Sequence, residues 1–246
     1  MMLRTIILAA GKGTRMKSEL AKVLHHLSGK PMLSYVVEAA KAAGSQDISV
    51  IIGYQADAVR ERFRDGALTF IEQFEQLGTG HAVLQAREKF HLYTGTVLIL
   101  CGDVPLLQAA TLRSLVDCHR RHKAAVTVLT TLLPDPTGYG RIIKGPTGKV
   151  RKIVEEKDAT EVEKKIKEIN TGIYCTESRF LFDALGKIGN NNAQKEYYLT
   201  DIIAIANENG DEVGSLAAFD SREVMGINTL QELAAADRYL ERGEKP

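Results

Sequence analysis

The chain has 246 residues, 44% of them hydrophobic, which suits one large α/β domain or one domain with a small appendage. Its 32 Lys and Arg residues nearly balance 31 Asp and Glu residues, which argues against nucleic acid as a partner. Three scattered cysteines form no CxxC pair, and no apolar run is long enough to be a membrane span or a signal peptide. We therefore expect a soluble, cytoplasmic protein.

Short apolar runs alternate with amphipathic segments, as is typical of parallel-sheet α/β folds. Buried strands are predicted at residues 5–10, 48–52, 68–71 and 96–100, and a further β-rich run at 125–131. Helices are predicted at residues 32–43, at 57–63 with Asp57 as the cap, at 79–87, and after residue 103, where Leu112, Leu115, Val116 and His119 share one face.

The remainder of the chain is predicted less regularly. Residues 135–174 carry more Gly, Pro and charge, and we expect strands there that form a substrate wall over the sheet. Thr229 and Glu232 have the spacing of a capping box, which predicts a helix at residues 230–242 followed by a frayed tail. The expected division is a domain at residues 1–228 and a helix or linker at 229–246.

The first predicted strand runs into a glycine loop, Gly11-Lys12-Gly13. Glycines after a buried strand let backbone N–H groups approach phosphate oxygens, and Lys12 and Arg15 add positive charge. The dinucleotide fingerprint is excluded because Met16 replaces its third glycine, and no Walker A string occurs. The loop alone is also compatible with a tight turn that carries surface charges.

Longer strings carry a family resemblance. The segment at residues 8–16, LAAGKGTRM, followed by Lys22-Val23-Leu24, resembles the signature of the sugar-phosphate nucleotidyltransferases. Further strings at residues 75–82, 102–106, 136–142, 153–159, 168–172 and 192–201 resemble the branch that acts on N-acetylglucosamine-1-phosphate with UTP. They span nearly the whole chain in the family's order, so they are more specific than the glycine loop.

The chain departs from the family pattern in three ways. Ala21 replaces a common proline before Lys22, which is expected to loosen the loop, and Cys101 replaces a tyrosine. The third departure is that the family's bacterial members usually continue into a hexapeptide-repeat β-helix that acetylates glucosamine-1-phosphate. No such repeat occurs in these 246 residues, so no acetyltransferase activity is expected from them.

The resemblance implies a Rossmann-like, mixed but mainly parallel sheet flanked by helices, the fold of the nucleotide-diphospho-sugar transferases. It also implies uridylyl transfer from UTP to N-acetylglucosamine-1-phosphate, which supplies cell-envelope precursors. The attacking phosphate oxygen is already anionic, so catalysis needs alignment and charge neutralisation but no protein nucleophile. Asp103 follows a buried strand and is the best candidate ligand for Mg²⁺, which prefers oxygen donors. The resemblance adds Asn228 as the second ligand. A helix cap or a turn remains open for Asp103, and a helix start for Asn228.

Catalytic roles are expected for Arg15, Lys22 and Asp103, with Lys12, Arg15 and Lys22 binding phosphates. Gln73 and the Gly78-Thr79 pair are candidate readers of uracil, although Gln73 alone could be a polar strand end. Gly140, Glu155, Asn170 and Thr171 are expected to line the sugar pocket. With these, the complete set of expected substrate contacts comprises Leu8, Ala9, Ala10, Gly11, Lys12, Gly13, Lys22, Gln73, Gln76, Gly78, Thr79, Cys101, Gly102, Gly140, Glu155, Asn170, Thr171 and Asn228.

Other readings stay open. A related enzyme could use another sugar phosphate or dTTP, and a non-catalytic nucleotide-sugar sensor would bind without releasing pyrophosphate. The six histidines lack HExxH spacing, so His25, His26 and His81 are expected to be structural. These residues are expected to form a monomer or a weak dimer, and a trimer only together with the β-helix half.

Overall fold

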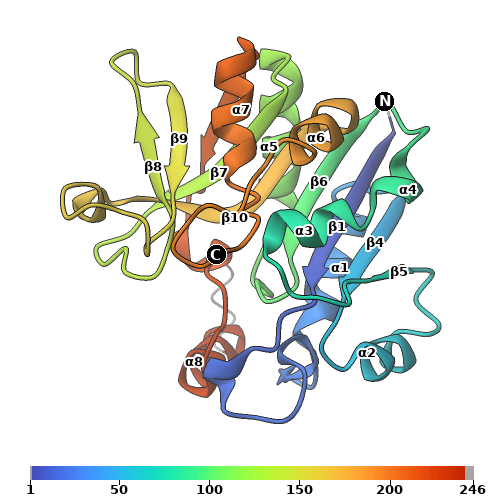
Figure 1. Ribbon diagram of the computed structural model, residues 1–246. Helices are drawn as coiled ribbons and strands as arrows, with labels where there is room; N and C mark the ends of the chain where they lie inside the picture. The colour runs from blue at the N-terminus through green and yellow to red at the C-terminus, as the bar shows by residue number, and fades with distance from the viewer. Residues whose placement is uncertain (1, 242–246) are drawn as a thin grey trace.

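A mixed, mainly parallel sheet organises the molecule, of which the computed structural model describes residues 2–241 (Figure 1). Only β10 runs against the other strands of the main path. The predicted Rossmann-like sheet flanked by helices is confirmed. In spatial order its strands are β11 (Val213–Ala217), β7 (Val126–Leu132), β10 (Glu168–Glu177), β6 (Thr96–Cys101), β1 (Leu3–Ala9), β4 (Asp47–Ile52) and β5 (Thr69–Glu72).

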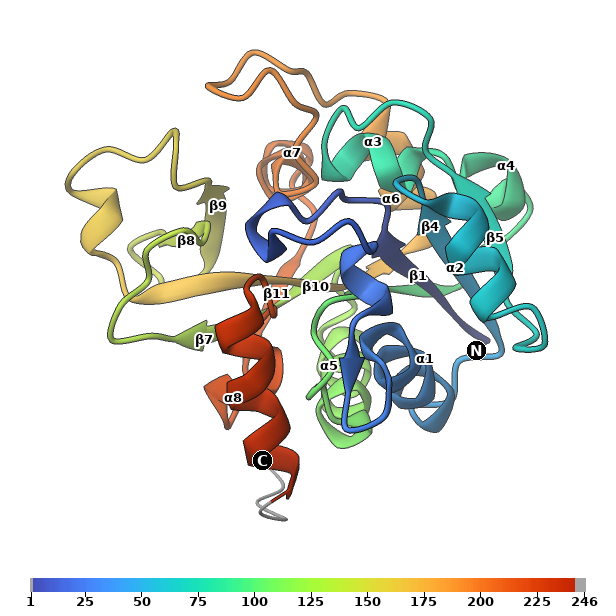
Figure 2. The same cartoon turned by 90° about the horizontal axis from the view of Figure 1, so that it is seen from below.

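Helices cover both faces of this sheet, as the view in Figure 2 shows. Side chains of β1 alternate between the faces, so Leu3 and Ile7 enter one core while Ile6 enters the other. Because both faces are covered, the central strands are mostly apolar, and their few central polar residues, such as Thr5 and Ser49, are buried as well. The first core contains residues of α1 (Met32–Ala42), α2 (Ala56–Arg62) and α5 (Ala109–His122), and the second of α3 (Thr79–Leu84), α4 (Arg87–Phe90), α6 (Ser178–Leu185) and α7 (Asp201–Asn209).

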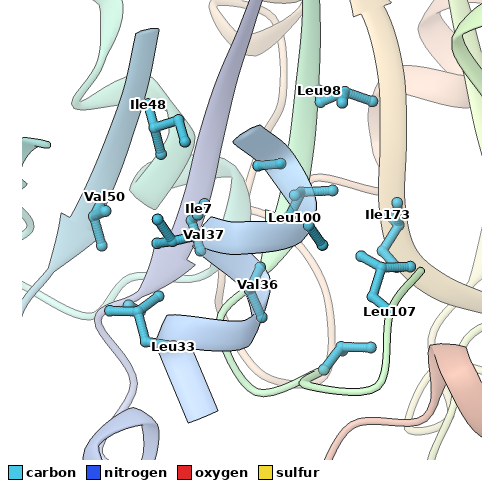
Figure 3. Close-up of a cluster of buried hydrophobic side chains, with 14 of the residues drawn as sticks. Ile7, Leu33, Val36, Val37, Ile48, Val50, Leu98, Leu100, Leu107 and Ile173 are labelled. Atoms are coloured by element: carbon cyan, nitrogen blue, oxygen red, sulfur yellow. The ribbon is translucent and has the colours of Figure 1, made fainter. Parts of the chain in front are cut away.

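Figure 3 shows how the first core fastens the centre of the sheet. Ile7 of β1 and Leu100 of β6 lie beside helix α1, whose Val36 is fully buried, and Leu98 of β6 belongs to the same core. Each such side chain contributes about 1.5–3 kcal/mol through its removal from water. The predicted apolar face of α5 is confirmed, since Leu112, Leu115, Val116 and His119 are all buried. The strands are thereby held rigidly enough to position the loops that follow them.

The parallel register brings four strand ends to one edge of the sheet. Leu8 of β1 lies opposite Ile51 of β4 and Cys101 of β6, and Ile52 lies opposite Glu72 of β5. The chain leaves β1 toward β4 and later returns to β6 on the other side of β1. Such a change of direction opens a crevice beyond the carboxyl ends of the strands, where α/β sheets bind ligands.

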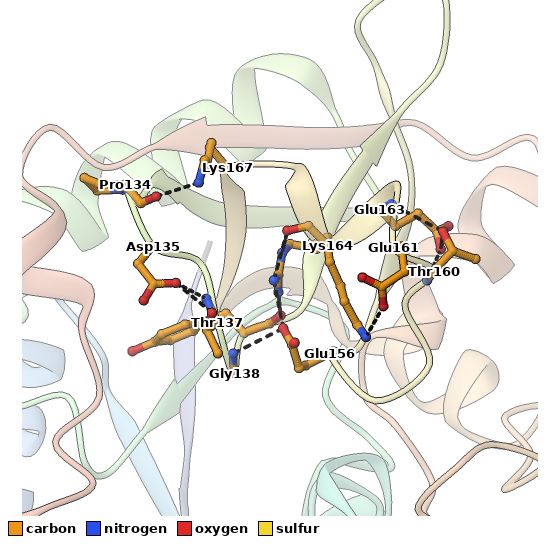
Figure 4. Close-up of polar contacts among 12 residues, drawn as sticks. Pro134, Asp135, Thr137, Gly138, Glu156, Thr160, Glu161, Glu163, Lys164 and Lys167 are labelled. Carbon is orange, nitrogen blue, oxygen red and sulfur yellow. Dashed lines mark hydrogen bonds and ion pairs between the residues drawn. The ribbon is translucent and has the colours of Figure 1, made fainter.

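A second lobe stands beside this edge. It consists of β8 (Arg141–Lys144), β9 (Val150–Val154) and the start of β10, in agreement with the irregular strands predicted at residues 135–174. Polar contacts hold its outer loops (Figure 4). Arg141 is buried and pairs with Glu156 at 2.7 Å, Glu156 accepts from the amide of Gly138, and Lys167 donates to the carbonyl of Pro134. The network fixes the chain on either side of Gly140.

The last described helix, α8 (Leu230–Glu241), packs against a hairpin of β2 (His26–Leu27) and β3 (Lys30–Pro31). A small core joins them, including Leu27, Ile227 and Ala236. The predicted capping box is confirmed: Glu232 accepts from the amide of Thr229 at 2.9 Å, and its own amide donates to the Thr229 hydroxyl at 3.2 Å. The frayed tail predicted at residues 242–246 lies outside the described residues.

Two helix predictions were wrong in detail. Asp57 is not the cap of α2, because left-handed Gln55 precedes the helix and Asp57 pairs with Arg60 in its first turn at 3.0 Å. The helix that was predicted at residues 79–87 ends at Leu84. The amide of Ala86 donates to the carbonyl of Val83, three residues earlier, and this tighter turn separates the helix from α4 (Arg87–Phe90). Within residues 2–241, no helix is long and apolar enough to cross a membrane.

Candidate active site

A cavity of about 400 Å³ lies at the carboxyl edge of β1, β5 and β6. The sequence predicts most of its lining, although the residues come from segments far apart in the chain. The expected residues that the structure brings together there are Leu8, Ala9, Ala10, Gly11, Gly13, Arg15, Lys22, Gln73, Gln76, Gly78, Thr79, Cys101, Asp103 and Asn228.

The glycine loop closes one side of this cavity. Gly13 has a left-handed φ of 63° and precedes a short 3₁₀ turn, η1 (Thr14–Met16). A Cβ on Gly13 would lie 2.6 Å from Cβ of Lys22, which begins the next turn, η2 (Lys22–Leu24). Glycine is therefore required both for the backbone conformation and for the close approach of Lys22.

Four polar side chains meet at the mouth of the loop and form a charge cluster of Arg15, Lys22, Asp103 and Asn228. The ammonium of Lys22 contacts the carboxylate of Asp103 and lies 2.6 Å from the amide oxygen of Asn228. The guanidinium of Arg15 donates to the same Asn228 oxygen at 2.8 Å. Lys22 and Asp103 are each largely buried. Two cationic side chains thus converge on two side-chain oxygens. The cations suit anionic phosphates, and the oxygens suit a hard metal cation.

The structure excludes helix capping by Asp103 or Asn228, although Asp103 does lie in the turn that follows β6. Helix α5 begins at Ala109 after Gln108, so Asp103 does not cap it. The Asp103 carbonyl instead accepts from the amide of Ile227 at 2.9 Å, which ties its loop to the segment of Asn228. Thr229 rather than Asn228 caps α8, and the Asn228 side chain faces the charge cluster.

The opposite end of the cavity is built from the loop after β5. The amide nitrogen of Gln73 lies 3.2 Å from the Gly78 carbonyl and 3.0 Å from Nδ1 of His81, and Gln76 donates to the Gln73 carbonyl. The Thr79 hydroxyl accepts from the amide of Leu199 at 3.0 Å. These contacts give the loop a fixed shape, and they agree with a structural role for His81.

Gly78 adopts a φ of 110° at the start of α3. A Cβ there would lie 2.7 Å and 2.8 Å from the backbone oxygen and nitrogen of Tyr197. The loop after β5 and the segment before α7 can therefore approach each other only because residue 78 has no side chain.

The departure at Ala21 does not loosen the loop. Its φ of −52° would suit a proline, but its amide donates to the side-chain oxygen of Gln55 at 2.7 Å. The side-chain nitrogen of Gln55 in turn donates to the Glu19 carbonyl at 2.7 Å. A proline could not make the first of these bonds, so Ala21 anchors the loop in another way.

The Cys101 side chain is shorter than the tyrosine that it replaces in the family pattern. Its sulfur donates to the carbonyl of Gly172 at 3.5 Å, between β6 and the bulge of β10. Burial raises the pKa of the Cys101 thiol to about 12, and the nearby carboxylate of Asp103 adds to this effect. The thiol is therefore protonated at neutral pH and lines the cavity as a small neutral group.

Four expected sugar-site residues lie in the second lobe and not in the lining of this cavity. Three are neighbours: the Asn170 amide donates to the Gly140 carbonyl at 2.8 Å, and the Glu155 oxygens would lie 3.4 Å from a Cβ on Gly140. Thr171 is buried, and its hydroxyl donates to the carbonyl of Leu129 at 2.7 Å. The side chain of Thr171 is thus engaged within the sheet.

Glu155 lines a second cavity of about 610 Å³, together with Asp158 and Asp201. Burial raises the pKa of Glu155, and the carboxylates of Asp158, Asp201 and Glu196 raise it further. Its neighbour Glu156 points to the ion pair with Arg141 instead. The two glutamates therefore do not form a catalytic pair.

The remaining expected residues lie just outside the first cavity. Lys12 is exposed, with its ammonium 5.7 Å from the ring centre of Tyr54, and Gly102 donates its amide to the Leu8 carbonyl at 2.9 Å. Sequence reasoning missed four lining residues, Thr14, Val23, Ala82 and Glu196. All four stand inside the strings that carry the resemblance, and that position was the available signal.

No group of three His, Cys, Asp or Glu side chains that could hold a metal occurs within residues 2–241. A metal at the charge cluster would therefore be held by few protein ligands, with substrate oxygens completing its coordination. Asp103 and Asn228 offer hard oxygen donors that already converge on one ammonium, so this donor set fits Mg²⁺.

Comparison with known proteins identifies the relatives of the chain. The family profile described as nucleotidyl transferase matches residues 4–230. The protein named Bifunctional protein GlmU from Geobacter metallireducens is 55% identical over 96% of this chain and 50% of its own length, and that from Geobacter sulfurreducens is 52% identical over 98% and 51%. The protein of the same name from Desulfotalea psychrophila is 51% identical over 97% of this chain and 70% of its length. The chain spans about half the length of the first two.

A solved structure of UDP-glucose pyrophosphorylase complexed with UDP-glucose superposes with a TM-score of 0.78. The match covers 99% of this chain and all of that one, at 16% sequence identity. At that identity the likeness supports the fold, and the chemistry must be argued from the residues.

Substitution Gly78→Ala is expected to lower the free energy of unfolding by about 1–3 kcal/mol, because alanine is strained at this φ and its Cβ meets backbone atoms. Urea denaturation measures the change. The control is Gly189→Ala, where nothing lies within 4 Å of the added Cβ and φ is ordinary, so the change should stay within about 1 kcal/mol. Equal effects of the two substitutions would contradict the inference that position 78 must lack a side chain.

Substitution Glu155→Gln is expected to raise the free energy of unfolding at pH 7. A carboxyl with a raised pKa in the folded state loses stability as pH rises through that pKa, and glutamine imitates its protonated form. The gain should shrink toward pH 4, where Glu155 itself becomes protonated. Exposed Glu161, whose pKa is lowered by its hydrogen bond with Lys164, is the control, and Glu161→Gln should give no gain at pH 7. A gain of the same size at both pH values would refute the argument.

Proposed function

Because this chain belongs to the nucleotidyl transferase family, we propose that it transfers uridylyl from UTP to N-acetylglucosamine-1-phosphate, giving UDP-N-acetylglucosamine and pyrophosphate. The convergence of Lys22 and Arg15 on the oxygens of Asp103 and Asn228 carries the proposal. The substrates are two anions that repel each other, and this cluster supplies the charge that brings them together. The high identity to the GlmU proteins over this half supports the choice of reaction.

The reaction proceeds by in-line displacement at the α-phosphorus of UTP. An oxygen of the sugar phosphate attacks, the bond from the α-phosphorus to the bridging oxygen breaks, and pyrophosphate leaves. Backbone amides of the loop at residues 11–14 and the side chains of Arg15 and Lys22 bind the phosphates and neutralise charge that shifts to the leaving group. Lys12, exposed beside the loop, adds positive charge there.

Asp103 and Asn228 would hold Mg²⁺, as the convergence of their oxygens on Lys22 indicates. When bound, the ion supplies further neutralisation of phosphate oxygens. The ammonium of Lys22 would then move from these oxygens to the phosphates, which its flexible stem allows.

The end of the cavity at Gln73, Gln76, Gly78 and Thr79 is assigned to uracil. The Gln73 amide nitrogen is engaged by Gly78 and His81, so its oxygen and the backbone of the loop are the groups offered to a base edge. The small side chains of Ala9 and Ala10 leave room for a flat ring. The sugar is assigned to the second lobe, where Gly140, Glu155 and Asn170 are neighbours.

The wider assignments follow from the same proposal. We propose residues 1–228 as the nucleotidyltransferase unit and residues 229–246 as a helix or linker segment. We propose a cytoplasmic protein, which suits its three free cysteines, and a monomer or weak dimer for these residues alone. Sedimentation as a stable trimer would contradict the latter.

The test is pyrophosphate release from UTP, Mg²⁺ and N-acetylglucosamine-1-phosphate, with parallel reactions containing glucose-1-phosphate, dTTP or EDTA. We expect metal-dependent release that favours uracil and the N-acetylated sugar. Release with only another sugar or nucleotide would overturn the substrates and keep the class. Binding of UDP-N-acetylglucosamine without any release would establish the sensor function instead.

Substitution Asp103→Ala is expected to lower kcat by at least about 100-fold, because it removes a carboxylate ligand and the partner of Lys22. The measurement is initial rate at saturating substrates, with circular dichroism to verify the fold. Asp211→Ala, on the surface after α7, is the control and should retain the rate of the unchanged protein. Near-normal turnover in Asp103→Ala would refute the metal assignment.

A further inference from the structure

The Glu232 carboxylate makes one contact that a capping box does not require. Such a box joins the residue three positions into the helix with the amide of the cap, here Glu232 with Thr229. The same oxygen of Glu232 also accepts from the amide of Asn228, at 2.6 Å. That amide lies one residue before the cap and belongs to the segment that enters the charge cluster.

The segment that carries Asn228 is fastened at both ends. The amide of Ile227 donates to the Asp103 carbonyl at 2.9 Å, and the amide of Asn228 donates to Glu232. Between these bonds the side-chain nitrogen of Asn228 donates to the Gly226 carbonyl at 2.9 Å. This last bond turns the side-chain oxygen toward Lys22 and Arg15.

Helix α8 is itself anchored to the other side of the site. Asp237 accepts from both the amide and the hydroxyl of Ser28, at 2.7 Å each, in the hairpin that follows Lys22. Apolar contacts of Leu27 and Ala236 accompany these bonds. The helix therefore holds Glu232 in a fixed position relative to both η2, the turn that begins at Lys22, and Asn228.

We propose that Glu232 is a positioning residue for the reaction: it holds the backbone of Asn228 so that the amide oxygen of that residue faces the cation and phosphate end of the site. The inference rests on the proposed function, since Asn228 is a ligand only there. Glu232 does not line the cavity. It acts through Asn228, as residues behind a metal ligand commonly do.

Thr229 provides a matched comparison. Its hydroxyl accepts from the amide of Glu232 and stabilises the same helix end, but it makes no bond to Asn228. Thr229→Val keeps the shape and removes this half of the box. Glu232→Ala removes both bonds of the carboxylate, and Glu232→Gln restores an oxygen acceptor in the same place.

The experiment measures the affinity of each full-chain variant for Mn²⁺ alone, by electron paramagnetic resonance of the free ion, together with hydrogen exchange of a peptide that contains residues 226–229. We expect Glu232→Ala to weaken Mn²⁺ binding about tenfold or more and to speed exchange of the Asn228 amide. Thr229→Val should stay within about twofold of the unchanged protein in Mn²⁺ affinity, and Glu232→Gln should recover most of it.

Equal weakening in Thr229→Val and Glu232→Ala would overturn the proposal, because it would reduce Glu232 to a helix cap. Unchanged Mn²⁺ affinity in Glu232→Ala would overturn it as well. Failure of the proposed function has a different signature: the unchanged protein would bind no Mn²⁺ and release no pyrophosphate, and the role of Glu232 would be refuted with it.

Discussion

The parallel pairing of β1 with β6 is the constraint on which the site depends. It places the loop after Leu8 beside the loop after Cys101, so that Lys22 and Asp103 can meet although 81 positions separate them in the sequence. The apolar cores on both faces of the sheet hold this pairing in place. Electrostatic preorganisation at the mouth of the cavity is therefore a product of hydrophobic packing several residues away. The second lobe and helix α8 add to this edge without altering it.

Much of this organisation could be predicted from the sequence because its signals are local. Apolar runs predicted the strands that form the centre of the sheet, and the spacing of Leu112, Leu115 and Val116 predicted the buried face of α5. The capping box predicted the start of α8 at its correct residue. Within the site, the glycine loop, Gln73 and Asp103 each follow a strand, and a parallel sheet brings such positions to one edge.

The rest depends on contacts between distant segments. Aspartate is a residue type that often caps helices, but the left-handed conformation of Gln55 makes α2 begin at Ala56, before Asp57. Helices α6 and α7 and strand β11 were not predicted, because their stability comes from packing against elements already in place. The Ala21 amide is anchored by Gln55, 34 positions later, which no local pattern reveals. The sugar-site residues remain predictions, since they line no common cavity with Asp103.

In the ion pair of Lys22 with Asp103, the protein itself supplies the anion that neutralises the lysine ammonium. Both side chains are largely shielded from water in the folded chain, so much of the desolvation cost of the lysine has been met before any phosphate arrives. An incoming phosphate then exchanges one anionic partner of the ammonium for another, and the binding free energy reflects only the difference between two ion pairs. Such a site would hold an incoming anion only moderately tightly and would release it readily.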